Sequence, residues 1–389
     1  MITQTRGMNL RVLQHLEKRI LENVVNLCEE NDLTYYISGG TYLGAVRHQG
    51  FIPWDDDIDI ALPRDDYRNL LDILAASLPS PLKLVTYENT EGYNFLRAQV
   101  WDPRINVVLT NYSDKRTQPV WIDIFPLDGV PNPGLRRHIW KLKLRAVELL
   151  WGIARIDEAS EVSAGRSVVR QKVLDLARAS KITKLLDAKT WTRHRDDVLQ
   201  QVSFADAEYC INAVGAYKFK SIFNRAEVYG SGSQYSFEGM SLNGPANFDF
   251  YLTQIYGAYL ELPPVHARNW HGTEISVTTD FLSAVLLLDG SDLNLMEHLS
   301  EIARDKASYL FVAVLVENDS DQVNVTAFSA AASENFDEIV ILTPDRLKSG
   351  LQSLPVQCIF VSAKQESKFH DLSSFMDIPT HTIDLNSKS

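Results

Sequence analysis

The chain has 389 residues, which is more than one hydrophobic core usually organises, so its length predicts two domains or one domain with a large appendage. Its composition is 45% hydrophobic and 23% charged, with 19 Gly and 15 Pro, and this excludes collagen-like, low-complexity and disordered classes. The formal net charge of −12 argues against general affinity for nucleic acid, so we expect no nucleic-acid partner.

The distribution of apolar residues and cysteines indicates in which cellular compartment the protein is expected. Apolar runs such as 309–316 are far shorter than the ~20 residues that a membrane-spanning helix needs. The first residues contain no apolar segment of the kind found in secretory signals, and the three cysteines are far apart without metal-ligand spacing. We therefore expect a cytoplasmic protein.

Hydrophobic periodicity and turn residues predict the elements of the first third of the chain. Apolar residues from Leu13 to Leu27 recur at three- and four-residue steps, which is typical of an amphipathic helix. The predicted elements up to the break at 129–134 are, in chain order, a helix over 9–30, a strand over 33–37, a short helix over 41–47, a strand over 57–62, a helix over 65–78, and strands over 82–86, 95–102, 106–109 and 121–125.

The segment 134–200 is predicted to be helical and is basic, with 15 Lys and Arg against 8 Asp and Glu. Its first helix, over 138–151, is rich in leucine and carries two tryptophans. Such a helix can lie on an anionic bilayer surface, so we expect a peripheral contact at the inner membrane face. An ordinary domain helix is the alternative, because lysines and leucines alternate at a two-residue step that does not separate cleanly onto helical faces.

Beyond residue 273 the chain changes to short apolar runs separated by helical stretches. The runs span 284–288, 310–316, 338–342 and 356–361. This pattern is typical of buried parallel strands in a small α/β domain. We therefore predict a mixed α/β protein with a first domain over 1–273 and a smaller Rossmann-like parallel-sheet domain over 274–389.

Four carboxylates carry the densest chemical pattern. If 57–62 is extended, Asp55, Asp57 and Asp59 project to one face, because side chains two apart on a strand point the same way. Hard oxygen ligands at that spacing suit Mg²⁺ or Mn²⁺. Asp123, in a second alternating stretch, is the candidate for a third carboxylate from a neighbouring strand, which would allow a site with two ions.

Other interpretations of these aspartates fit the neighbouring residues less well. The aspartate-rich motif of prenyl-diphosphate enzymes needs a helix, which Pro53 and the β-branched alternation disfavour. An EF-hand loop requires glycine where Ile60 stands. A solvated acidic loop would not interleave apolar residues as regularly as Ile52, Ile58 and Ile60 do.

The segment 39–60, GGTYLGAVRHQGFIPWDDDIDI, together with PRDDY at 63–67, resembles the LicD family of phosphocholine transferases, which includes the fukutin-related proteins. The resemblance covers roughly 8–272. It continues through IDIFPLDG at 122–129, FEG at 237–239, YG at 256–257 and PP at 263–264.

This resemblance implies a nucleotidyltransferase-type catalytic domain over 1–273, with 134–200 as a helical insert. It further implies transfer of a phospho-alcohol, usually phosphocholine, from a CDP-activated donor to a hydroxyl of a cell-surface glycan or its lipid-linked precursor. By position, Asp57 and Asp59 become metal ligands and Asp123 a third carboxylate, which we also choose as the proton acceptor.

Five residues are candidates for substrate contacts. Gly39 and Gly40 match the phosphate turn, where missing Cβ atoms let backbone N–H groups approach a phosphate. Arg47 and Arg97 are candidate phosphate clamps, because a guanidinium can bind two oxygens at once, with surface arginines as the alternative. Trp54 offers an aromatic face to a choline headgroup, with core packing as the alternative.

The segment 288–298 with its following strands resembles a cytidylyltransferase of the glycerol-phosphate type. In that family a glycine-containing turn and two histidines contact the nucleotide phosphates. Here only Asp292 and His298 match the family's residues, whereas Leu295 replaces the first of the two histidines and Glu297 replaces the glycine. Leucine cannot donate to a phosphate and glutamate would repel it. We therefore expect a degenerate module for docking or homo-oligomerisation.

The aspartate motif alone leaves two other functions open. One is a nucleotidyltransferase that adds a nucleotide monophosphate to a small hydroxylated acceptor, which would release pyrophosphate instead of CMP. The other is a non-catalytic scaffold for glycan assembly, which the presence of all three catalytic-type aspartates disfavours.

Overall fold

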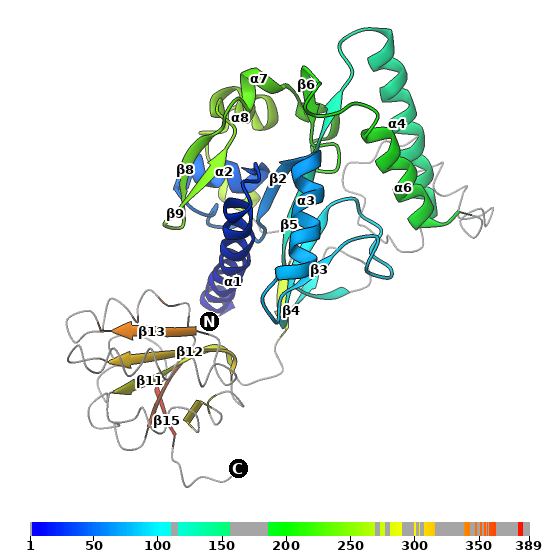
Figure 1. Cartoon of the computed structure of the whole chain (residues 1–389). Coiled ribbons are helices and arrows are strands. Elements are labelled where there is room, and N and C mark those ends of the chain that lie inside the picture. The colour runs from blue at the N-terminus through cyan, green and yellow to red at the C-terminus, as the bar shows by residue number, and fades with distance from the viewer. Residues whose placement is uncertain are drawn as a thin grey trace. The chain divides into compact units, whose positions relative to one another are not determined.

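The computed structural model divides the chain into two compact units (Figure 1). One comprises Leu16–Pro103 and Val107–Glu274, and the other Met1–His15, Arg104–Asn106 and Ile275–Ser389. The structure describes residues 2–109, 116–155, 186–268, 273–276, 281–289, 299–300, 303, 307–315, 338–342, 347, 351, 354, 356, 358–362 and 380–383. The predicted domain division between 273 and 274 stays a prediction.

A mixed sheet forms the frame of the larger unit. Its eight strands, counted among the described residues, are β1 (Tyr36–Ile37), β2 (Asp59–Pro63), β3 (Lys83–Val85), β4 (Ala98–Leu109), β5 (Arg116–Val130), β6 (Tyr209–Ile211), β7 (Ile222–Asn224) and β10 (Thr273–Ser276). The central order is β1-β2-β5-β4. Strands β2 and β5 run parallel, and their register puts Asp59 opposite Asp123. Side chains that are directly opposite lie on the same face of a sheet, so these two aspartates share a face.

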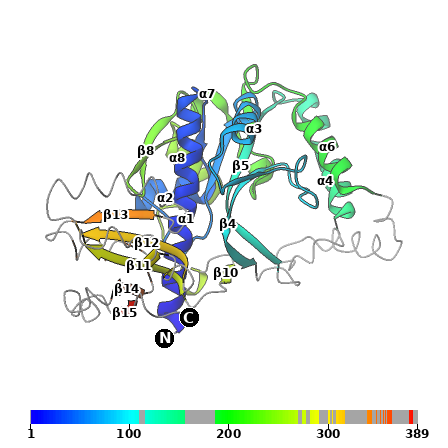
Figure 2. The same ribbon diagram turned by 60° about the horizontal axis from the view of Figure 1, so that its bottom comes forward.

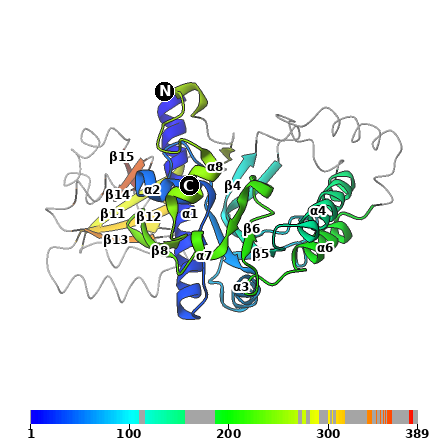
Figure 3. The same cartoon turned by 90° about the horizontal axis from the view of Figure 1, so that it is seen from above.

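Helices and one hairpin surround this sheet. They are α1 (Ile2–Glu30), α2 (Gly39–His48), α3 (Arg64–Ser77), α4 (Leu135–Ala154), α6 (Ala188–Leu199), α7 (Arg225–Val228), α8 (Phe248–Tyr256), the 3₁₀ turns η2 (Lys218–Ser221) and η3 (Val265–Ala267), and the hairpin of β8 (Ser233–Phe237) and β9 (Met240–Gly244). Helix α1 buries Leu16, Ile20 and Val24 almost completely, at the predicted helical spacing. Helices α4 and α6 lie side by side (Figure 3).

Two predicted breaks in extended structure are wrong. The predicted strands over 95–102 and 106–109 are one strand, β4, which continues through Pro103 because proline lacks only the N–H and still adopts extended backbone. Strand β5 likewise runs to Val130, beyond the predicted break at Gly129. A Cβ at Gly129 would lie 2.5 Å from the Ser203 carbonyl oxygen, so this glycine marks a close backbone approach.

The smaller unit contains a parallel sheet of five described strands (Figure 2). They are β11 (Phe281–Asp289), β12 (Ala307–Leu315), β13 (Glu338–Leu342), β14 (Cys358–Ser362) and β15 (Thr380–Ile383). Their spatial order, β13-β12-β11-β14-β15, places the first strand at the centre, as in doubly wound dinucleotide-binding folds. The predicted mixed α/β fold with a Rossmann-like parallel sheet is confirmed. Positions 292, 295, 297 and 298 lie outside the described residues.

A buried arginine connects the strand that carries Asp59 to the rest of the larger unit. Arg64 opens α3 directly after β2, and its Nε and Nη2 donate to the two carboxylate oxygens of Asp128 on β5, both at 2.7 Å. Its Nη1 lies 2.9 Å from Oδ1 of Asp196 on α6. Asp128 is 1% exposed, and these two carboxylates raise the pKa of Arg64 against the effect of its burial. The network therefore fixes β2 and α3 against β5 and α6.

Replacing Arg64 should destabilise the larger unit, because Asp128 would remain buried without its counter-charge. We expect Arg64→Met to lower the free energy of unfolding by about 3–5 kcal/mol, measured by urea denaturation followed by circular dichroism. The control is Arg68→Met on the same helix, whose pair with Asp65 is exposed and should contribute less than about 1 kcal/mol. Equal losses in both variants would contradict a structural role for the buried network.

Candidate active site

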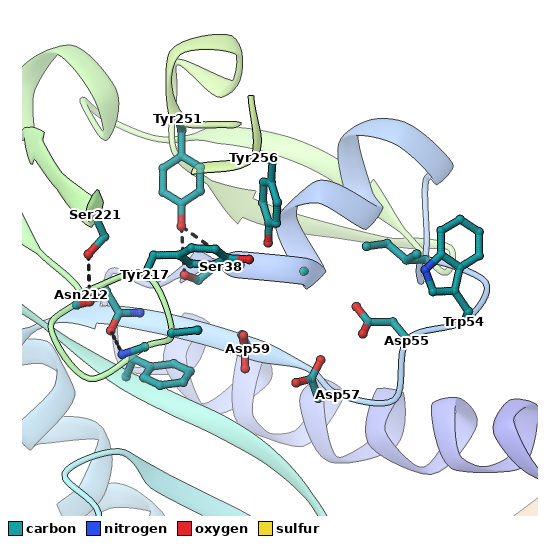
Figure 4. A pocket seen from close by; sticks show the side chains of 16 residues that line it. Ser38, Trp54, Asp55, Asp57, Asp59, Asn212, Tyr217, Ser221, Tyr251 and Tyr256 are labelled. Atoms are coloured by element: carbon teal, nitrogen blue, oxygen red, sulfur yellow. Dashed lines mark hydrogen bonds between the residues drawn. The ribbon is translucent and has the colours of Figure 1, made fainter. Parts of the chain in front are cut away.

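The three clustered aspartates, Asp55, Asp57 and Asp59, line one cavity of about 290 Å³ in the larger unit (Figure 4). Its lining combines the start of α2, the segment before β2 and residues that follow far later in the chain. The lining residues are Ser38, Gly39, Gly40, Ile52, Trp54, Asp55, Asp57, Asp59, Phe125, Asn212, Gly215, Ala216, Tyr217, Ser221, Tyr251 and Tyr256.

The aspartates converge by a different route from the predicted one. Only Asp59 belongs to β2, whereas Asp55 and Asp57 lie in the irregular segment before it, so the prediction that one strand carries all three is wrong. The segment turns sharply after Pro53, and the Asp55 N–H donates to the Ile52 carbonyl at 2.9 Å. A turn replaces the strand, and all three side chains still face the cavity (Figure 4).

The glycine pair makes room for two of these carboxylates. A Cβ at Gly39 would lie 2.7 Å from Oδ2 of Asp59, and a Cβ at Gly40 would lie 2.6 Å from Oδ2 of Asp55. Gly39 also has a φ of +56°, which side-chain-bearing residues rarely adopt. Both carboxylates thereby reach the first turn of α2, where the partial positive charge of a helix N-terminus favours them. The role of the pair as a phosphate turn stays a prediction.

The cavity concentrates negative charge. Burial, followed by the charges of Asp57, Asp123 and Asp55, raises the pKa of Asp59, and Arg97 opposes this only in part. No Lys, Arg or His is found among the described residues that line the cavity. The site therefore favours the approach of a cation.

The donor chemistry of the cavity fits a hard divalent cation. Carboxylate oxygens are the ligands that Mg²⁺ and Mn²⁺ prefer, and the cavity leaves room for substrate oxygens. Across the described part of the chain, no three His, Cys, Asp or Glu side chains are already arranged to hold a metal ion. Binding would thus require the oxygens of Asp55, Asp57 and Asp59 to turn toward one point.

Asp123 lies beside the cavity instead of lining it. Its side chain is buried, and Oδ1 accepts hydrogen bonds from Arg97 Nε at 2.6 Å and from Gln99 Nε2 at 2.8 Å. The Arg97 guanidinium also lies 4.5 Å from the centre of the Phe95 ring. Arg97 thus orients Asp123, and the predicted roles of both residues toward substrate stay predictions.

Arg47 and Trp54, the other two candidates, have different surroundings. Arg47 Nη1 donates to the carbonyl oxygens of Tyr259 at 2.8 Å and Glu261 at 3.5 Å, which fastens that segment to the end of α2. It does not belong to the described cavity lining, so its role as a phosphate clamp stays a prediction. Trp54 does line the cavity, and the Arg268 guanidinium lies 5.1 Å from the centre of its ring.

A tyrosine wall faces the aspartates, and sequence reasoning missed it (Figure 4). The hydroxyl of Tyr251 lies 3.2 Å from Ser38 Oγ and accepts from the Gly39 N–H at 3.4 Å, which ties α8 to the start of α2. Burial raises the pKa of Tyr251, Tyr256 and Tyr217, so all three rings stay neutral. The YG pair at 256–257 belonged to the family resemblance, but no local pattern distinguished these tyrosines from core residues.

Comparison with known proteins agrees with this geometry. Residues 32–144 match the family model described as LicD/FKTN/FKRP, nucleotidyltransferase domain. These residues form a LicD-family domain. The resemblance predicted from the motifs is therefore confirmed, and so is the prediction of a phosphotransferase enzyme at the level of the family.

Two relatives of the LicD domain have names that state an activity. The lipopolysaccharide cholinephosphotransferase LicD of Haemophilus influenzae is 28% identical over 277 residues, which cover 68% of this chain and 97% of the relative. The human ribitol 5-phosphate transferase FKRP is 28% identical over 106 residues, covering 26% of this chain and 21% of the relative. The similarity to the bacterial relative thus extends well beyond the LicD domain.

The close approach at Gly40 gives a test of the site geometry. In the parent protein, Gly40→Ala should lower the free energy of unfolding by about 1–3 kcal/mol, because the new methyl group meets Asp55 Oδ2. In an Asp55→Ala background the same change should instead stabilise by up to about 1 kcal/mol, because alanine favours a helix. Urea denaturation of the four proteins measures this reversal. An effect of the same sign in both backgrounds would show that Asp55 does not approach the helix.

Proposed function

We propose that this protein transfers a phospho-alcohol from a CDP-activated donor to a hydroxyl of a cell-surface glycan or its lipid-linked precursor. The observation that carries the proposal is the single cavity in which carboxylates face a tyrosine wall beside the N-terminus of α2. The relatives act as a cholinephosphotransferase on lipopolysaccharide and as a ribitol 5-phosphate transferase, and both names describe transfer of a phospho-alcohol.

Asp57 and Asp59 are the proposed ligands of a divalent cation, Mg²⁺ or Mn²⁺. When bound, this ion would neutralise the charge of the donor phosphates as the bond to the leaving CMP breaks. The first turn of α2, with Gly39 and Gly40, offers the positive end of a helix dipole to the same phosphates. Charges and dipoles that are already oriented toward the reacting phosphate are the main contribution a protein makes to this class of reaction.

Asp123 is the proposed third carboxylate and proton acceptor for the attacking hydroxyl. It shares a sheet face with Asp59, and its Oδ1 is fixed by Arg97 and Gln99. A carboxylate held in this way keeps one orientation while a proton is transferred, which general base catalysis requires. In this arrangement Arg97 acts as a positioning residue for Asp123.

The aromatic wall supports choline as the transferred alcohol. A quaternary ammonium group has no hydrogen-bond donor and is recognised by aromatic ring faces, often with a carboxylate nearby. Tyr217, Tyr251 and Tyr256 line the cavity on the side facing the aspartates, and Trp54 lines it beside Asp55. Ribitol and glycerol, which carry hydroxyl groups, would gain less from such a wall.

The decisive assay is incubation with Mg²⁺ and CDP-choline, CDP-ribitol or CDP-glycerol, following CMP release. Asp57→Asn and Asp59→Asn should each reduce the rate at least about 100-fold, because ligands that stabilise transition-state charge are lost. Their melting temperatures should remain close to that of the parent. Asp65→Asn, an exposed carboxylate on α3, serves as the matched control and should retain activity.

Different products separate the alternatives. Pyrophosphate release with a nucleoside triphosphate would favour nucleotide transfer to a small hydroxylated acceptor. The absence of any product with every donor would favour the non-catalytic scaffold. Full activity of either aspartate variant would reject the proposed ligands.

We further propose that α4 contacts an anionic membrane surface. Leu135, Ile139 and Leu142 are 77%, 46% and 62% exposed, and their spacing puts them on one helical face. The opposite face packs Trp140 and Leu144 into a buried cluster with Leu199 and Ile211. Leu142 is exposed like its neighbour Lys143 whereas Leu144 is buried, so leucines and lysines do not separate cleanly onto two faces, as their two-residue alternation predicts.

The charges beside this face support an anionic partner. Arg136, Lys143 and Arg145 are exposed near the apolar stripe. An apolar stripe flanked by cations is typical of helices that lie in the membrane interface. No helix in the described part of the chain has the length and apolar character to cross a bilayer. A surface contact of this kind would bring the cavity to an acceptor carried by a lipid.

Vesicle co-sedimentation tests the membrane contact. The protein should sediment with vesicles of 30% phosphatidylserine. Each Lys or Arg near the surface should contribute about 1 kcal/mol to the free energy of binding, and high salt should weaken the binding. Leu135→Asp combined with Leu142→Asp should abolish sedimentation. Leu260→Asp, an equally exposed leucine outside α4, is the matched control. Sedimentation of the α4 variant equal to that of the parent would contradict the proposal.

A further inference from the structure

One buried carboxyl group near the cavity has no role in the function described so far. Glu17 lies on α1 and is 0% exposed. Neither Oε1 nor Oε2 has a hydrogen-bond partner among the described residues. Burying a carboxylate without a partner costs several kcal/mol, and native proteins rarely tolerate it without a reason.

The position of Glu17 on α1 makes this more unusual. It stands between Leu13, Leu16 and Ile20, on the helix face that is otherwise buried and apolar. An ordinary core position there would carry another aliphatic side chain. A glutamate at this place therefore needs a counterpart that the described side chains do not supply.

The surroundings of Glu17 identify the counterpart by its charge. After burial itself, the strongest influences on the Glu17 carboxyl are the charges of Asp57, Asp56, Asp55 and Asp123, and each of them raises its pKa. All four belong to the segment before β2 or to β5, next to the cavity. Helix α1 passes behind Asp57 in the view of the cavity (Figure 4). Glu17 thus adds a fully buried carboxyl group to this acidic cluster.

We propose that Glu17 is a further oxygen donor of the divalent-cation site, supplied by α1. The inference rests on the proposed metal-dependent function, and it adds a residue outside the LicD motifs. With a cation bound, the Glu17 carboxyl would gain a counterpart that the described residues do not supply, and the repulsion among like charges would be offset. A fully buried glutamate would supply one ligand position from the protein interior, so that positions on the cavity side would stay open to phosphate oxygens.

The test measures Mn²⁺ binding by titration calorimetry and by the loss of the free-ion electron paramagnetic resonance signal, without any donor substrate. Glu17→Gln keeps the shape of the side chain and removes its charge. It should weaken Mn²⁺ binding at least about 10-fold, as the loss of a supporting carboxylate does at other metal sites. Glu22→Gln, on the same helix and 40% exposed beside Lys18, is the matched control and should bind as the parent does.

Thermal unfolding provides a second readout that a merely structural role would not reproduce. Without added metal, Glu17→Gln should melt at or above the temperature of the parent, because glutamine is always neutral whereas burial and the nearby aspartates disfavour the charged form of Glu17. At saturating Mn²⁺ the parent should gain more in melting temperature than the variant, since tighter binding stabilises more. A lower melting temperature with unchanged Mn²⁺ affinity would overturn the proposal.

Asp59→Asn separates this inference from the proposed function. If Asp59→Asn loses Mn²⁺ binding while Glu17→Gln retains it, only the role of Glu17 is rejected. If the parent itself binds no Mn²⁺, the proposed metal-dependent function fails together with this inference. Should Glu17→Gln not fold, Glu17→Asp retracts the carboxylate by one methylene; weaker binding then supports the assignment, and unchanged binding rejects it.

Discussion

The structure depends on holding several carboxylates of like charge against the first turn of α2. Asp55 and Asp59 approach that turn so closely that no Cβ fits at Gly39 or Gly40. Burial and then repulsion among these groups raise the pKa of Asp59, and Arg97 offsets this only in part. Such an arrangement attracts cations, and a site that transfers phosphate groups requires this attraction.

The short segment from Asp59 to Arg64 connects the chemistry of the site to the stability of the fold. Strand β2 begins at Asp59, whose neighbour across the sheet is Asp123. The residue after its last position, Arg64, enters the buried network with Asp128 and Asp196. Because Arg64 directly follows the five-residue strand that begins at Asp59, a shift of the network would also move the carboxylate in the cavity.

The later part of the larger unit completes the site from a distance. Tyr217, Tyr251 and Tyr256 close the cavity opposite the aspartates, and the hydroxyl of Tyr251 joins α8 to Ser38 and Gly39. Helix α4 packs one face into the domain and leaves the other exposed. In the proposed function, the tyrosines would form a wall for the transferred group, and α4 would form a surface for an acceptor held on a membrane.

The sequence by itself determined the features that are local along the chain. The apolar spacing of α1, the short helix after the glycines, the buried parallel strands of the smaller unit and the family motif around Asp57 and Asp59 all follow from patterns within a few residues. Tertiary structure alone decided the surroundings of polar groups: Arg97 donates to Asp123 and Arg47 to the Tyr259 carbonyl, whereas Glu17 is buried without a hydrogen-bond partner among the described residues. Periodicity reveals which face of an element is buried, but it does not reveal what packs there. A charged side chain takes its role from groups that the fold brings close, often from more than a hundred residues away.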